Sequence, residues 1–281
     1  MSEAAPALTE IALRGAGAGA LALAFGGAPL GVLLIARRMS LSGDALSHGV
    51  LAGAAMAFLI AGPNPWALTL GALIAAVVVT SLSSLLARTR RLPEDAAFAV
   101  VYLSALAAGV LIISRVAGPE MLEQLLFGAA NAPLDRPTLL LLGGAATASL
   151  LTLAVFLRGF VAESVDPGLV RASGRSGGGL HLLLMLLVAL NLVAGFRAFG
   201  ALMTVALMMI PAAAARFWAT GYAGQAGFAI ALSALSSATG LLLAARFGGE
   251  AGAVMTLCAA GVFALSGLFG PQGGVLSARR R

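Results

Sequence analysis

Long apolar runs separated by short polar segments are the main pattern along the chain. A helix needs roughly 20 consecutive apolar residues to cross a bilayer, and many of these runs reach that length without a charge. Polar and helix-ending residues divide the chain into about nine predicted spans of roughly 20 residues each: 11–35, 44–61, 66–87, 96–114, 138–157, 180–195, 198–215, 225–245 and 251–269. The sixth and seventh are short and separated only by Phe196 and Arg197. One of them is therefore expected to be broken or re-entrant, which gives eight or nine helices.

The predicted fold class is an all-α polytopic transmembrane protein, with residues 1–281 in a single transmembrane domain. The composition agrees, because 60% of the residues are hydrophobic, 10% are charged and the mean hydropathy is +1.01. A soluble domain needs more charge on its surface. The 36 glycines also suit membrane helices, where small residues let backbones approach closely. Gly49 and Gly53, four residues apart, fit that pattern.

Every one of the 17 basic residues is an arginine, and they lie at the ends of predicted spans. Orientation in a lipid bilayer explains the net charge of +6 better than binding to nucleic acid. Cytoplasmic loops of membrane proteins carry the excess of positive charge. With the N-terminus outside, cytoplasmic segments hold 12 of the 17 arginines, and residues 158–179 form the longest inner loop. The first run lacks the basic start of a signal peptide, so we expect a retained span.

Ionisable residues inside the predicted spans are few, and two of them are four residues apart. Asp44 and His48 lie just inside the second span, and this spacing puts both side chains on one face of a helix. A carboxylate oxygen and an imidazole nitrogen suit Zn²⁺ or Mn²⁺ better than an alkali ion. From spacing alone a structural role is the stronger interpretation, with Asp44 capping the helix and His48 bonded to a neighbouring carbonyl. Two ligands also leave a tetrahedral site incomplete without water, another helix or a second subunit.

The chemical motifs that the chain lacks narrow the function further. It has no Gly-x-x-x-x-Gly-Lys-Ser/Thr phosphate loop and no lysine at all, so we do not expect it to hydrolyse ATP itself. The His-Glu-x-x-His motif of many metalloproteases is also missing from the sequence. Any energy for transport is therefore expected to come from a partner or a gradient.

Four segments resemble sequences of one known family. They are residues 37–51, which include Asp44 and His48, the acidic loop 91–97, the Asp-Pro segment 166–174 and the Gly-to-Pro-Ala-Ala helix 200–216. Their order and their places in the predicted topology match the permease subunits of bacterial zinc and manganese ABC importers. The chain resembles that family over nearly its whole length.

The resemblance implies the ABC importer permease fold and a homodimer in the bacterial inner membrane. It also implies two cytoplasmic ABC ATPase subunits and an extracytoplasmic metal-binding protein as partners. Asp44 and His48 would contribute to a metal-coordinating site on the translocation path, which reverses the balance against the structural role. The metal, zinc or manganese with iron as a third candidate, would be the transported substrate, and no cofactor is expected.

The inner loop has its own place in this interpretation. The resemblance implies a coupling helix that docks on the ATPase, with residues Asp166, Pro167, Leu169, Arg171 and Gly174. Asp166 can cap a short helix that has Pro167 at its first position, and Gly174 can end it. The alternative is an ordinary capped loop helix.

Two rival functions fit parts of the sequence. A proton-coupled secondary transporter would use Asp44 and His48 as a proton relay and would need no ATPase. A membrane-embedded enzyme would use a bound metal for catalysis, but the clustered polar residues that such an enzyme needs are too few here.

Overall fold

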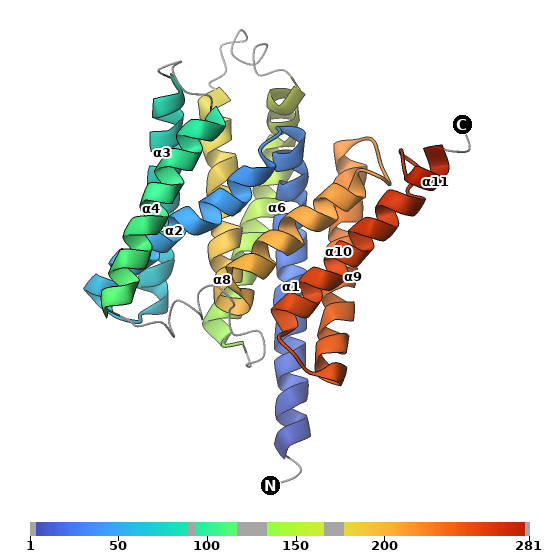
Figure 1. Ribbon diagram of the computed structural model, residues 1–281, viewed down its shortest axis with the longest axis horizontal. Helices are drawn as coiled ribbons and strands as arrows, with labels where there is room; N and C mark the ends of the chain where they lie inside the picture. The colour runs from blue at the N-terminus through green and yellow to red at the C-terminus, as the bar shows by residue number, and fades with distance from the viewer. Residues whose placement is uncertain (1–3, 89–93, 117–133, 166–176, 279–281) are drawn as a thin grey trace.

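The computed structural model describes residues 4–88, 94–116, 134–165 and 177–278, and this part of the chain is helical with no strand (Figure 1). Eight of the described helices are long and apolar enough to cross a membrane. They are α1 (Ala4–Ala36), α2 (Ser40–Ala61), α3 (Pro65–Arg88), α4 (Glu94–Val116), α6 (Arg136–Val165), α8 (Gly177–Ala215), α9 (Tyr222–Phe247) and α10 (Ala251–Phe269). The short α11 (Val275–Ala278) follows α10. The prediction of an all-α, multi-pass membrane protein is confirmed.

Helix α8 contains both the sixth and the seventh predicted spans, but it does not break at Phe196 and Arg197. Gly200 has φ 78° and ψ 169°, a backbone conformation essentially restricted to glycine. A Cβ atom on Gly195 would lie 2.6 Å from Oγ1 of Thr204, although nine residues of straight helix span roughly 13 Å. The chain therefore folds back at Gly200, and α8 forms two legs rather than one continuous span.

The path of the chain agrees with nine legs. In Figure 1, α1 begins at the lower end of the molecule and α10 ends at the upper end, which requires an odd number of traverses. The eight apolar helices give nine legs once α8 is counted as two. That number matches the segments predicted from the apolar pattern. The side of the membrane that each end faces stays a prediction from the arginine distribution.

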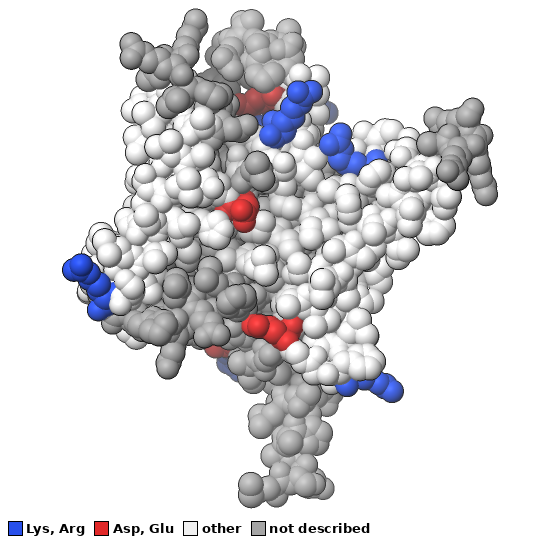
Figure 2. Space-filling model, viewed as in Figure 1, with Lys and Arg blue, Asp and Glu red and all other residues white. Residues whose placement is uncertain are grey.

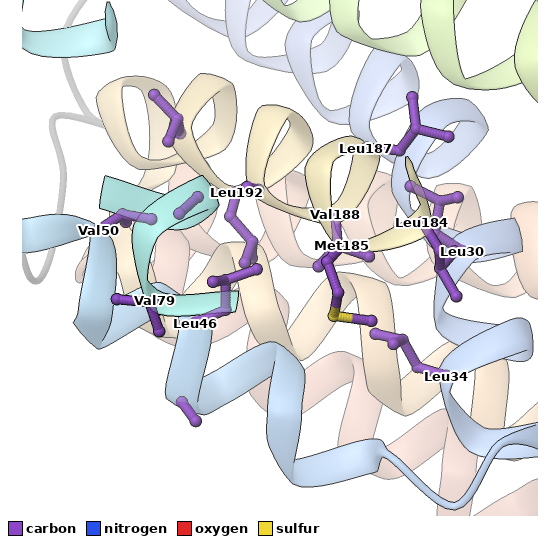
Figure 3. Close-up of a cluster of buried hydrophobic side chains, with 14 of the residues drawn as sticks. Leu30, Leu34, Leu46, Val50, Val79, Leu184, Met185, Leu187, Val188 and Leu192 are labelled. Carbon is purple, nitrogen blue, oxygen red and sulfur yellow. The ribbon is translucent and has the colours of Figure 1, made fainter. Parts of the chain in front are cut away.

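A buried apolar cluster holds the first helices against α8 (Figure 3). Its members include Leu30 and Leu34 of α1, Leu46 and Val50 of α2, Val79 of α3, and Leu184, Met185, Leu187, Val188 and Leu192 of α8. Large apolar side chains also cover the outside of the helices. Ile60, for example, is 80% exposed. Apolar residues both inside and outside are expected of helices whose outer surface faces lipid.

Helix α2 fits closely against α3 and α4 because glycines meet at the crossings. A Cβ atom on Gly53 would collide with the carbonyl oxygen of Gly71 in α3, and a Cβ on Gly71 with that of Gly53. On the α4 side, a Cβ on Gly109 would lie 2.9 Å from the backbone of Ala52. The expectation that Gly49 and Gly53 mark a close helix crossing is confirmed for Gly53. These contacts fix where α2 lies.

The Gly53→Leu variant is expected to lose stability, because its side chain must push α2 and α3 apart. Overpacking of a tight interior typically costs about 1–3 kcal/mol, and here the obstacle is backbone, which cannot rotate away. Gly143→Leu in α6 is the matched control, since nothing lies within 4 Å of a Cβ at that position. The midpoint of thermal unfolding in detergent would be lower for Gly53→Leu only. Equal midpoints for the two variants would contradict the close crossing.

Candidate metal site

Asp44 does not cap the helix that carries it. Helix α2 begins at Ser40, its N-cap residue is Met39, and no side chain makes a capping hydrogen bond there. The helix thus begins one turn earlier than the predicted span 44–61, and Asp44 lies inside it. The capping interpretation of Asp44 is wrong.

Asp44 and His48 lie together on one face of α2, as their spacing predicts. Oδ1 of Asp44 and Nε2 of His48 are 3.7 Å apart, and the two side chains are 60% and 31% exposed. This distance is too long for a hydrogen bond. Two donors at 2.0–2.2 Å from a tetrahedral ion are about 3.4 Å apart. A small shift of either side chain would therefore let both contact one metal ion.

The ring of His48 is not held by a neighbouring carbonyl. Its Nδ1 atom is buried and has no hydrogen-bond partner in the described part of the protein, while Nε2 faces Asp44. The second half of the structural interpretation therefore also fails, and Nε2 is the nitrogen placed to bind an ion beside the carboxylate.

The opposite face of α2 is buried in the apolar core. Leu46 and Val50 are fully buried there (Figure 3), so Asp44 and His48 point away from the core. Asp44 is the only acidic residue of α2, and Figure 2 shows that charged groups are sparse on the face viewed there. An exposed carboxylate in a membrane helix needs water, a counter-charge or another subunit beside it. The face that carries the pair is therefore unsuited to lipid.

Residues around the pair fix the local backbone. Oγ of the buried Ser47 donates a hydrogen bond to the carbonyl oxygen of Asp44 at 2.6 Å. Gly43 lies close to α8, because a Cβ at that position would be 3.2 Å from Cε of Met208. Met208 is fully buried and fills this gap between helices, a common use of methionine. The pair is thus carried by a packed segment of helix and not by a loop.

A buried ion pair near the start of α2 was not predicted from the sequence. Nη2 of Arg37 lies 2.8 Å from Oε2 of Glu163, and the two side chains are 6% and 10% exposed. The apolar run in this region predicts a span that ends at residue 157, whereas α6 continues to Val165. Glu163 thus lies in the last turns of a helix and not in a loop.

The predicted coupling residues lie outside the described part of the chain. They are Asp166, Pro167, Leu169, Arg171 and Gly174. Helix α6 ends at Val165 and α8 begins at Gly177, so helices occupy both ends of the segment 158–179 that was expected to form the inner loop.

A second ion pair lies at the other end of the molecule. Nη2 of Arg197, in α8, is 3.4 Å from Oδ2 of Asp135, which precedes α6. The backbone N–H of Thr138 donates to Oδ1 of Asp135 at 3.2 Å, so Asp135 caps α6. Hydrogen bonding from Thr138, assisted by the charge of Arg197, holds the pKa of the Asp135 carboxyl below its ordinary value. This exposed pair links α6 and α8 and is remote from Asp44 in sequence.

The described residues contain no group of three or more His, Cys, Asp and Glu side chains that could hold a metal ion. One copy of the described chain therefore offers the two donors Asp44 and His48 and leaves the coordination shell open. Water or a second copy would have to supply the remaining ligands.

Comparison with known proteins decides the family. A model of the ABC 3 transport family matches residues 10–270, nearly the whole chain. The chain belongs to the ABC 3 transport family. The resemblance seen in its four sequence segments is confirmed.

Relatives of this ABC 3 family member carry two kinds of name. The chain is 30% identical over 249 residues to the manganese transport system membrane protein of Halalkalibacterium halodurans. The aligned region covers 88% of this chain and 84% of that protein. It is 32% identical over 241 residues to the high-affinity zinc uptake system membrane protein of Haemophilus influenzae, with 85% and 90% covered. The names thus include both metals expected from the donor pair.

Solved structures support the fold of the ABC 3 family member. The structure of PsaBC from Streptococcus pneumoniae in complex with a Fab matches with a TM-score of 0.84 at 27% identity, covering 95% of this chain and 94% of that one. An inward-facing conformation of a putative metal-chelate type ABC transporter matches with a TM-score of 0.69 at 16% identity. The predicted ABC importer permease fold is confirmed.

Asp44→Asn is expected to weaken the binding of Mn²⁺ and Zn²⁺ to the purified protein in lipid nanodiscs. The amide keeps the shape of the side chain but removes the charge that attracts the ion. The loss should exceed about tenfold, because even groups in the outer shell of metal sites typically contribute that much. Asp135→Asn, which removes an exposed carboxylate elsewhere, should bind as the unmodified protein does. Equal dissociation constants for all three proteins would exclude Asp44 as a ligand.

Proposed function

We propose that this chain is the membrane-spanning permease subunit of an ATP-driven importer of a divalent transition metal. Manganese and zinc are the leading substrates, and iron is a third candidate. The observation that carries the proposal is the Asp44 and His48 pair, whose Oδ1 and Nε2 atoms lie 3.7 Å apart on one face of a membrane helix. The names of the relatives support the same substrate class.

The site would be completed by a second copy of the chain. A homodimer that brings the two copies of α2 together would supply four donors, two carboxylates and two imidazoles, which is the number a tetrahedral ion requires. It would also remove the exposed carboxylate from lipid. Water could take the place of one or two of these ligands for Mn²⁺, because carboxylate and water both suit that ion.

Metal would enter from an extracytoplasmic binding protein and leave towards the cytoplasm. Asp44 and His48 would replace part of the hydration shell of the ion while it passes through the apolar part of the membrane. Two cytoplasmic ATPase subunits would act on the segment between α6 and α8, which includes Asp166 and Gly174. Transport requires the site to bind the ion without trapping it, and two ligands from each copy allow such release.

The rival functions predict different energy sources. A proton-coupled transporter would carry metal without an ATPase and would respond to the proton gradient. A membrane-embedded metalloenzyme would convert a substrate as an isolated chain. Membership of the ABC 3 transport family favours the ATP-driven importer over both.

Uptake of Mn²⁺ or Zn²⁺ into proteoliposomes tests the proposal directly. The chain is purified with its own ATPase and metal-binding partners, and uptake is expected only when ATP reaches the ATPase. Asp44→Asn and His48→Ala should each lower uptake at least about tenfold, in line with the loss of a metal-site group. Asp135→Asn should transport normally.

Two controls separate the possible failures of this experiment. An ATPase partner that binds but cannot hydrolyse ATP should abolish uptake, and a protonophore should leave it unchanged. Uptake that persists without ATP and disappears with the protonophore would replace the proposal with the secondary transporter. Near-normal uptake by both site variants at normal expression would show that the pair does not hold the metal.

A further inference from the structure

The buried pair of Arg37 and Glu163 lies between the two regions that the proposed function uses. We propose that Arg37 and Glu163 are positioning residues that tie the metal-site helix α2 to the end of α6, so that displacement of α6 by the ATPase changes the affinity of the site for metal. This inference rests on the proposed function and names the contact that links the metal-site helix α2 with the end of α6.

The contact joins segments that are far apart in the sequence. Directly after the end of α1, Arg37 reaches α6 with two donors: Nε donates to Oγ of Ser164 at 3.1 Å, and Nη2 bonds Oε2 of Glu163 at 2.8 Å. Nη2 also lies 3.3 Å from the carbonyl oxygen of Phe160, whose ring is 5.8 Å from the guanidinium carbon. These partners cover almost one turn of α6, so the guanidinium is fixed in both position and orientation.

On one side of the pair, a short connection leads to the metal site. The segment Arg37 to Met39 is all that separates α1 from α2. Its backbone is hydrogen-bonded into α1, because the N–H of Met39 donates to the carbonyl of Leu34 at 2.9 Å, and Arg38 has a positive φ of 59°. Asp44 follows within the next four to five residues, roughly 6–8 Å along the helix axis. Because little flexible chain lies between Arg37 and Asp44, a displacement of Arg37 is expected to displace the site as well.

On the other side, Glu163 lies two residues before the end of α6 at Val165. The chain continues from there into the segment on which the ATPase is proposed to act. A force applied to that segment acts directly on the last turn of α6, as it does on the first turn of α8. Through the bonds to Arg37, it is then passed to the connection between α1 and α2.

The chemistry of the contact suits a role in positioning the helices better than a role in stabilising the fold. A buried ion pair is seldom more stabilising than well-packed apolar side chains of similar volume, because both charges lose their hydration. The planar guanidinium, however, bonds its partners in one geometry. Arg37 and Glu163 therefore hold the connection after α1 against the end of α6 in one geometry.

The experiment measures how strongly nucleotide changes metal affinity. The full chain, in complex with its own ATPase subunits in nanodiscs, is titrated with Mn²⁺ without nucleotide and with a non-hydrolysable ATP analogue. The ratio of the two dissociation constants is the coupling between the sites. In the unmodified complex a ratio of at least about five is expected, the low end for coupled sites, and in Arg37→Ala and Glu163→Gln it should fall towards one.

Three further variants make the result specific. Arg158→Ala removes an exposed arginine from the same end of α6 and should keep the full ratio. The exchange Arg37→Glu with Glu163→Arg restores opposite charges and should raise the ratio above that of either single variant. Ser164→Ala removes only the bond to Nε and should cause a smaller loss than Arg37→Ala.

A purely structural role would give a different pattern. The variants would then lower thermal stability or metal affinity equally with and without nucleotide, and the ratio would stay at its original value. Folded Glu163→Gln complexes with an unchanged ratio overturn the proposal, and Glu163→Gln decides the matter if Arg37→Ala does not assemble. An exchange variant no better than the single variants also counts against it. Failure of the proposed function looks different, because the unmodified complex would itself bind no metal or show a ratio of one.

Discussion

The cost of placing an ionisable side chain in lipid is the constraint on which this structure depends. Arg37 and Glu163 meet it by pairing with each other in a buried contact. Asp135 and Arg197 meet it by lying at one end of their helices. Asp44 follows neither solution, since it is exposed and its neighbour His48 is not within hydrogen-bond distance. The face of α2 that carries Asp44 is therefore the part of the described surface that most needs something other than lipid beside it.

Close packing at small residues holds α2 on its other faces and leaves the face with Asp44 free. Gly53 and Gly71 let the backbones of α2 and α3 touch, and Gly109 does the same between α4 and α2. Close backbone contact gives van der Waals packing, which is the main attraction between helices in a membrane. Helix α2 is thus held on its glycine and apolar faces, through contacts that include Leu46 and Val50. The remaining face is free to carry polar groups whose positions are already fixed.

The lengths of the apolar runs predict the legs of the fold because the thickness of the bilayer imposes them. The apolar pattern predicts the break in α8 at Phe196 and Arg197, three to four residues before its actual place at Gly200, because Arg197 interrupts the apolar run. Arg197 can remain helical because it lies near the end of its leg and reaches Asp135, and the reversal occurs at Gly200, where the backbone conformation requires glycine. The spacing of Asp44 and His48 predicts their common face, which local helix geometry determines. The pairing of Arg37 with Glu163 joins positions 126 residues apart, and neither apolar pattern nor motif spacing carries that information.

The packing of the helices gives the ion pair its particular importance. Helix α2 packs mainly on α3 and α4, whereas α1 packs mainly on α6, α8 and α9, and direct contact between α1 and α2 is limited. Figure 1 shows α3 and α4 on one side of the molecule and α9 and α10 on the other. Arg37 lies where the chain passes from α1, which packs with α6, α8 and α9, to α2, which packs with α3 and α4. If the two groups move relative to each other, the connection of three residues after α1 must take part in that motion, because it joins them covalently. A metal site one turn beyond that connection would then respond to the motion, and it would respond less if it lay in the middle of either group.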